Sequence, residues 1–214
     1  MDRVRAGMTV TELMVVLAII GVLLTVAGFQ VAPWLDNGRL KTAARSAAGG
    51  LSLARSEAIR SGNVHLLVFQ QAIGAAGATV VSNDGPQSAM NCQVDTGETV
   101  HTFELPDGVE WGTSSALSNG APAPDDLGIS VAGISDGSSF SDATRVAASQ
   151  ATWVAFFPDG IPRLFTPSDC AALGQIGQGA GALYLTNQLR DYAVVLSPLG
   201  SVRVHGWGSA GWAL

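Results

Sequence analysis

A run of 23 residues without a charged side chain most limits what this chain can fold into. It extends from Leu13 to Leu35. A helix needs about 20 predominantly apolar residues to cross the hydrocarbon core of a bilayer. The leader before the run carries Arg3 and Arg5, and basic residues beside a membrane segment favour the cytoplasmic side. The sequence therefore predicts a single membrane helix over about residues 13–35, with a cytoplasmic N-terminus and the remainder exported.

Two features before the run separate it from an ordinary signal peptide. In a signal peptide the small-residue cleavage site follows the apolar stretch, whereas here the clearest small residue, Gly7, precedes it. Glu12 stands at the entrance to the run. An acid there can favour the first turn of a helix through its dipole. It can also be a functional charge, because ionisable groups at membrane depth are costly and usually paired.

The stretch from Gly7 to Val22, GMTVTELMVVLAIIGV, resembles the leader and first helix of type IV pilins and type II secretion pseudopilins. The resemblance implies that a prepilin peptidase cuts between Gly7 and Met8 and that Met8 is then N-methylated. Glu12 would be the fifth residue of the mature chain and would pair with the terminal amine of a neighbouring subunit. Met8 and Thr11 depart from the family, where phenylalanine and an apolar residue are commoner.

The helix is predicted to continue beyond the membrane as an amphipathic stalk, so that residues 8–60 form one N-terminal helical segment. Its apolar residues recur with a period near 3.6 and should pack against the exported head: Leu40, Ala43, Ala44, Ala47, Leu51, Ala54 and Ala58. Ser61-Gly62-Asn63 is typical of a helix end.

The head, residues 61–214, has the alternation of a β-rich domain. We expect strands within 64–69, 78–81, 99–103, 152–157, 182–186, 192–197 and 202–205. Residues 112–150 are rich in Ser, Gly, Ala and Asp and are predicted to form a long surface loop, with a short strand near 129–131.

Three stretches of the head are similar to the GspH/FimT family of minor pilins: 53–62, 156–163 and 194–204. The resemblance implies an α+β type IV pilin fold, with a long transmembrane and stalk helix packed on an antiparallel, sandwich-like head. It implies a non-enzymatic minor pilin of a type IV pilus that joins a tip complex priming filament assembly. The alternative is a minor pseudopilin of a type II secretion system.

The same resemblance implies the partners and the location. The partners would be other minor pilins or pseudopilins, the major pilin, the prepilin peptidase and an inner-membrane assembly platform. The chain would cross the bacterial inner membrane once, with its head in the periplasm, and would then reach the filament tip and the cell surface.

Charge argues against nucleic acid as a partner, although some family members bind DNA through a Gly-Arg-x-Arg hairpin. The matching stretch starts at Gly200 and has Ser201 in place of the first arginine. Residues 61–214 carry four basic and thirteen acidic side chains, a net charge of −9. Such a surface repels a polyanion.

Cys92 and Cys170 are the two cysteines, and both lie in the exported part. A disulfide between them is compatible with an oxidising periplasm, and two separate thiols are the alternative. No catalytic motif of the Gly-x-Ser-x-Gly or His-Glu-x-x-His type occurs. Asp125-Asp126 and the acidic stretch 136–142 lack EF-hand spacing, so we expect neither a metal nor a cofactor.

Overall fold

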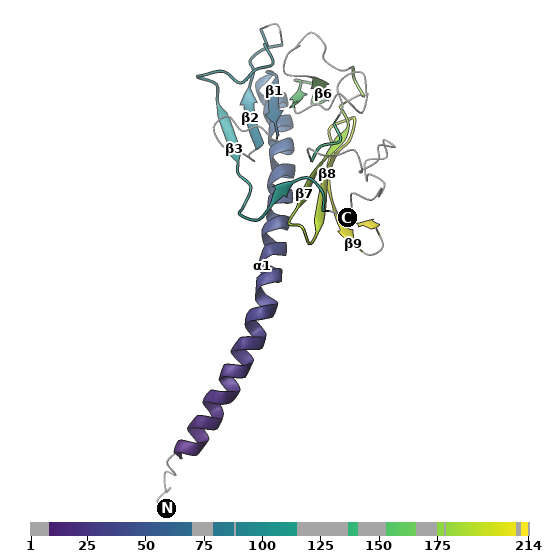
Figure 1. Ribbon diagram of the computed structural model, residues 1–214. Helices are drawn as coiled ribbons and strands as arrows, with labels where there is room; N and C mark the ends of the chain where they lie inside the picture. The colour runs from purple at the N-terminus through teal and green to yellow at the C-terminus, as the bar shows by residue number, and fades with distance from the viewer. Residues whose placement is uncertain are drawn as a thin grey trace, which may run out of the picture. The chain divides into compact units, whose positions relative to one another are not determined.

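The computed structural model describes residues 9–69, 79–87, 89–114, 137–140, 153–165, 175–177, 179–208 and 211–213. The side chains of 26–33, 79, 80 and 165 lie outside that description. The chain divides into two compact units, Met1–Gly38 and Arg39–Leu214, and each is described by itself (Figure 1).

A single helix, α1, runs over Val10–Ser61 and contains 52 residues. It ends where the Gly62 N–H donates to the Ala58 carbonyl at 3.1 Å and the chain turns through a positive φ at Gly62. Glycine adopts that conformation without steric penalty and commonly closes helices. The sequence predicted one helical segment over residues 8–60, and the structure has α1 over Val10–Ser61.

Within the second unit, α1 buries one face. All seven apolar residues that share this face in the sequence pattern are at most 3% exposed. Five of them are alanines: Ala43, Ala44, Ala47, Ala54 and Ala58. Because alanine side chains are short, the strands can pack close to this face of the helix.

The strands form two five-stranded sheets, and every strand pairing in them is antiparallel. The first sheet has the order β3-β2-β1-β5-β6. Its strands are β1 His65–Val68, β2 Thr79–Asn83, β3 Val100–Phe103, β5 Trp153–Phe156 and β6 Pro162–Phe165. The second sheet has the order β10-β9-β8-β7-β4. Its strands are β4 Glu110–Trp111, β7 Gly181–Thr186, β8 Asp191–Leu196, β9 Val202–Gly208 and β10 Gly211–Ala213.

The main core joins α1 to one face of each sheet. Leu67 and Val154 from the first sheet and Leu183 and Val194 from the second belong to one buried cluster with the helix face. The opposite faces carry smaller clusters. On the first sheet this cluster includes Leu66, and on the second sheet it consists of Ala182, Tyr184 and Ala193. Because β1 and β7 are buried on both faces, their sequences are almost continuously apolar.

The predicted loop 112–150 differs from expectation where it is described. Residues 137–140 are buried, and Ser138 forms a bridge with Leu183. The Ser139 N–H donates to the Ala182 carbonyl at 2.9 Å, and the Ala182 N–H donates to Ser139 Oγ at 2.8 Å. These bonds hold the segment against β7, so this part is not a surface loop. The short strand predicted near 129–131 lies outside the described residues.

Candidate functional site

Thr9 and Glu12 close the N-terminus of α1 with reciprocal hydrogen bonds. The Thr9 N–H and hydroxyl both donate to Glu12 Oε2 at 2.9 Å, and the Glu12 N–H donates to Thr9 Oγ1 at 3.3 Å. This arrangement is a capping box, whose sequence signature is Thr-x-x-Glu. Glu12 therefore stabilises its own helix, whatever it does in an assembly.

Glu12 nevertheless remains open to a second interaction. The residue is exposed, and its other carboxylate oxygen, Oε1, accepts no hydrogen bond from the described residues. A carboxylate held through one oxygen can accept a cation at the other. The cleavage site between Gly7 and Met8 lies outside the described residues and stays a prediction.

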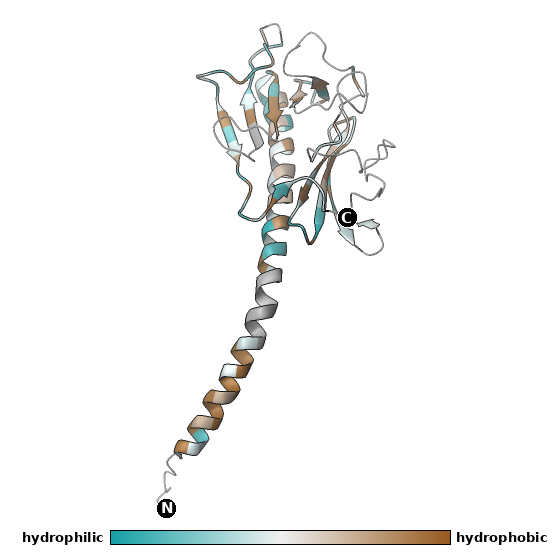
Figure 2. Cartoon of the chain, in the orientation of Figure 1, coloured by the Kyte–Doolittle hydropathy of each residue, from teal (hydrophilic) through white to brown (hydrophobic). Residues whose placement is uncertain are grey.

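Apolar residues follow Glu12 along α1, and Figure 2 shows this part of the helix mostly in brown, the colour of hydrophobic residues. Ten large ones between residues 13 and 24 are 40–68% exposed: Leu13, Met14, Val15, Val16, Leu17, Ile19, Ile20, Val22, Leu23 and Leu24. A helix that is hydrophobic all round is typically buried in a protein or a membrane. This surface therefore needs a cover that the isolated chain does not provide.

The polar groups within this apolar stretch are satisfied locally. The Thr25 hydroxyl donates to the Gly21 carbonyl one turn earlier, at 2.8 Å. Such back-bonding lets a hydroxyl enter an apolar environment without leaving an unpaired donor. Among the residues that the structure describes, no helix reaches the length and apolarity required to span a membrane.

Two tight turns of the head meet at Arg55 on α1. The turns, Phe157–Ile161 and Ser197–Ser201, are closed by hydrogen bonds from Gly160 N–H to the Phe157 carbonyl and from Gly200 N–H to the Ser197 carbonyl. Arg55 donates from its Nη1 to the Gly200 carbonyl at 2.9 Å. The sequence stretches 156–163 and 194–204 thus contain the two turns through which the sheets contact the helix at Arg55.

Gly160 and Gly200 are required at these turns for two reasons. Both have a positive φ, +75° and +82°, which glycine adopts without strain. A Cβ on Gly200 would also lie 2.8 Å from the Gly160 carbonyl oxygen, and one on Gly160 would lie 2.8 Å from Ile59 Cδ1. The Gly160 carbonyl oxygen is backbone and leaves no space for a side chain at Gly200, whereas the exposed Ile59 side chain near Gly160 can rotate away.

Cys92 lies in the ordered connection between β2 and β3. It is fully buried and disulfide-bonded, and the buried Asp84 carboxylate accepts the Asn91 and Cys92 N–H groups at 3.1 and 2.9 Å. Burial raises the pKa of Asp84. Cys170 lies outside the described residues, so its pairing with Cys92 stays a prediction.

The three histidines lie on three different strands: His65 on β1, His101 on β3 and His205 on β9. Within the described part of the chain, no group of three His, Cys, Asp or Glu side chains is arranged to hold a metal ion. Asp125, Asp126, Asp136 and Asp142, the acidic residues of the two loop stretches, lie outside the described residues.

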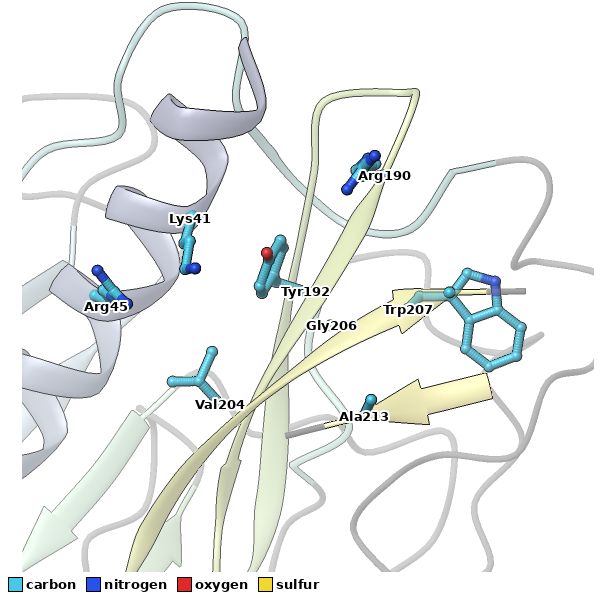
Figure 3. A pocket seen from close by; sticks show the side chains of 9 residues that line it. Lys41, Arg45, Arg190, Tyr192, Val204, Gly206, Trp207 and Ala213 are labelled. Atoms are coloured by element: carbon cyan, nitrogen blue, oxygen red, sulfur yellow. The ribbon is translucent and has the colours of Figure 1, made fainter. Parts of the chain in front are cut away.

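The sequence patterning did not predict a cavity of about 470 Å³ between α1 and the edge of the second sheet. Figure 3 shows Lys41 and Arg45 on the helix, across from Tyr192 and Val204 on the strands. Arg190 and Trp207 also line it. The sequence could have indicated only that Lys41 and Arg45 lie one helical turn apart. The other lining residues come from distant parts of the chain.

Comparisons with known proteins agree with the N-terminal and head patterns. A family model described as Type II transport protein GspH matches residues 43–200, and one described as Prokaryotic N-terminal methylation motif matches residues 2–28. No curated protein matches the chain. A similar solved structure is the minor pseudopilin EpsH from the type 2 secretion system of Vibrio cholerae. It has 12% sequence identity and a TM-score of 0.41, with coverage of 80% of this chain and 99% of that chain.

The matched region begins on the buried face of α1 and extends through β8 to the turn at Gly200. It therefore contains most of the core and both turns that contact Arg55. On this match, the chain belongs to the type II transport protein GspH family.

Proposed function

We propose that this chain is a minor pseudopilin of a type II secretion system, a non-enzymatic subunit of a membrane-anchored filament. The observation that carries the proposal is the exposed apolar part of α1 with a single carboxylate, Glu12, at its start. The family match supports a role in type II transport. It favours secretion over the type IV pilus, which was the main expectation from sequence.

Processing would precede assembly. The N-terminal methylation motif covers residues 2–28, which include the predicted cut between Gly7 and Met8. The leader, with Arg3 and Arg5, would stay cytoplasmic, and the head would face the periplasm. We propose that residues 13–35 cross the inner membrane before the subunit enters the filament.

Assembly would use helix packing and one charge pair. In an apolar environment an unpaired carboxylate or ammonium costs several kcal/mol. The amine that cleavage exposes on one subunit would meet Glu12 of its neighbour through the open Oε1, while Oε2 keeps the capping box. The exposed apolar side chains from Leu13 to Leu24 would be covered by neighbouring helices.

The proposed partners are other pseudopilins, the prepilin peptidase and the inner-membrane assembly platform. The helix would provide the shared packing surface, whereas the two sheets of the head would select particular neighbours. A type IV pilus minor pilin at a tip complex is the second candidate. Loss of protein secretion without loss of pili in a deletion strain separates the two.

Direct DNA binding remains the third and least supported function. The described basic residues of the head are Arg163, Arg190 and Arg203, and the net charge of residues 61–214 is −9. Phosphate contacts need clustered Lys and Arg, so a mobility-shift experiment should show no DNA complex at physiological salt.

The test separates the charge of Glu12 from its capping role. In Glu12→Gln the amide oxygen can still accept the Thr9 hydrogen bonds, but the charge for the neighbouring amine is lost. Thr9→Val removes the hydroxyl of the capping box and leaves the carboxylate charged. We expect Glu12→Gln to reduce secretion of a reporter substrate at least about tenfold, the effect of losing about 1.4 kcal/mol from assembly.

Thr9→Val should retain most secretion, because it leaves the Glu12 charge in place and the lost cap contributes only about 1 kcal/mol. Both variants should be present in the membrane at wild-type amounts, measured by immunoblot. Wild-type secretion by Glu12→Gln, or an equal defect in Thr9→Val, would contradict the charge-pair mechanism.

A further inference from the structure

Among the described residues, three cations and Tyr192 line the cavity beside α1, and no acidic side chain does. Lys41 and Arg45 come from the helix, Arg190 from the turn before β8, Tyr192 from β8 and Trp207 from β9 (Figure 3). All five belong to the unit Arg39–Leu214. Segments distant in sequence therefore bring three positive charges to one opening.

The described part of the chain gives these cations no hydrogen-bond or ion-pair partner. Eight basic side chains belong to the described part of residues 39–214. Four interact with neighbouring groups: Arg39, Arg55, Arg60 and Arg163. The described residues offer no hydrogen bond or ion pair to the side chains of the other four, Lys41, Arg45, Arg190 and Arg203. Three of those four line the cavity.

The three cations come from parts of the chain that differ in charge. Lys41 and Arg45 belong to the basic part of α1, and Arg190 joins them from the acidic segment 61–214. Like charges gathered in one place repel one another, unless an anion from outside joins them. The arrangement is thus complementary to a negatively charged group that the chain itself does not supply.

Tyr192 gives the cavity a second kind of contact. It is half-buried on the face of the second sheet that packs on α1, so part of its ring faces solvent. Gly206 lies close to this ring, because a Cβ there would be 3.3 Å from Tyr192 Cε1. The Trp207 ring instead packs with Trp212 on the opposite face of the sheet. Tyr and Arg are among the residues most enriched at the energetic centres of protein–protein interfaces, whereas a purely phosphate-binding site would need no such ring.

We propose that the cavity binds an acidic peptide segment of a partner protein. A carboxylate would lie between Lys41, Arg45 and Arg190, and an adjacent apolar or aromatic side chain would pack against Tyr192. Arginine binds carboxylates through paired, charge-assisted hydrogen bonds. This inference is independent of the secretion role and of Glu12, since it concerns residues of the head and its own helix face.

The test uses the full-length protein in detergent and a synthetic probe, acetyl-Asp-Glu-Phe-Asp-Glu-amide. Its matched control peptide has Asn and Gln in place of Asp and Glu. The pocket variant is Lys41→Gln with Arg45→Gln and Arg190→Gln. The control variant is Arg203→Gln, which removes a charge of the same kind from an exposed position on β9 outside the cavity.

Isothermal titration calorimetry should show saturable binding of the acidic peptide and none of the neutral one. The pocket variant should bind at least about tenfold more weakly, as expected when interface arginines are removed. Arg203→Gln should stay within about twofold of the wild type. All three substituted side chains are exposed, so thermal unfolding should confirm that the variants are folded.

Three results would overturn the proposal. The first is absence of peptide binding, and the second is equal binding by the wild type and the pocket variant. The third is tighter, pocket-dependent binding of soluble dihexanoyl phosphatidylglycerol or of inorganic phosphate. That result would assign the cavity to a lipid headgroup or to anions in general. None of these outcomes bears on secretion by the Glu12 variants, so the two proposals fail separately.

Discussion

At the scale of single residues, Glu12 shows how one side chain can satisfy two requirements. The sequence allowed two roles for Glu12: an acid that favours the helix end, or a functional charge. In the structure, the capping box with Thr9 uses only the Oε2 atom of its carboxylate. The Thr-x-x-Glu pattern was present in the sequence and is a recognised signal. The proposed partner of Glu12, the amine of a neighbouring subunit, would belong to a second molecule, so a single chain cannot locate it.

His65 provides a prediction about pH. The side chain is buried on β1, and burial lowers its pKa. A lowered pKa means that the folded state favours the neutral ring, so this contribution to stability is complete above the ordinary pKa. It is lost as the pH falls through the lowered value. The free energy of unfolding should therefore decrease on acidification from about pH 7 towards about pH 5.

Denaturant unfolding of the wild type and of His65→Gln at each pH measures this effect. The stability advantage of the wild type should shrink as the pH falls. The two proteins share Asp84, whose raised pKa acts in the opposite direction, so the difference isolates the imidazole. His101→Gln, at an exposed position on β3, serves as the control. A pH-independent difference would show that the His65 ring does not contribute.

At the scale of elements, the helix was the easiest part to predict and the short strands were the hardest. The period of the seven apolar residues on α1 gave its buried face correctly, because helix packing follows local spacing. β4, β6 and β10 were not predicted. They contain two, four and three residues, and β6 begins with Pro162. Strands this short depend on neighbours for their hydrogen bonds, so their own sequences carry little signal.

The contact between α1 and the two turns predicts a large effect at Gly200. Gly200→Ala combines the strain of a positive φ, about 1–2 kcal/mol, with a Cβ that would lie 2.8 Å from the Gly160 carbonyl oxygen. Overpacking typically adds about 1–3 kcal/mol. The Gly62→Ala control has a similar φ, +71°, with nothing within 4 Å of its added Cβ.

Chemical denaturation of both variants measures the difference. Gly200→Ala should lower the free energy of unfolding by at least about 1 kcal/mol more than Gly62→Ala does. Equal losses would show that the turn can move away from Arg55 without cost. The contact between the helix and the turns would then be loose rather than close-packed.

At the scale of the whole molecule, the low content of charged residues is an average over parts that differ. The run Leu13–Leu35 carries no charged side chain, whereas residues 61–214 carry a net charge of −9. The sequence predicted that difference, and with it the disfavoured role of DNA. It could not predict the cavity, because Lys41, Arg45, Arg190 and Tyr192 come together only once α1 and the second sheet are packed.

The central claim is that the chain is a processed, membrane-anchored pseudopilin. Mass spectrometry of the N-terminal peptide tests it most directly, on protein purified from the membranes of cells that contain a prepilin peptidase. We predict a chain that begins at Met8 and carries one methyl group on its terminal amine. In Gly7→Ala the leader should be retained. A wild-type chain that begins at Met1, or one cut after the apolar run, would contradict the account.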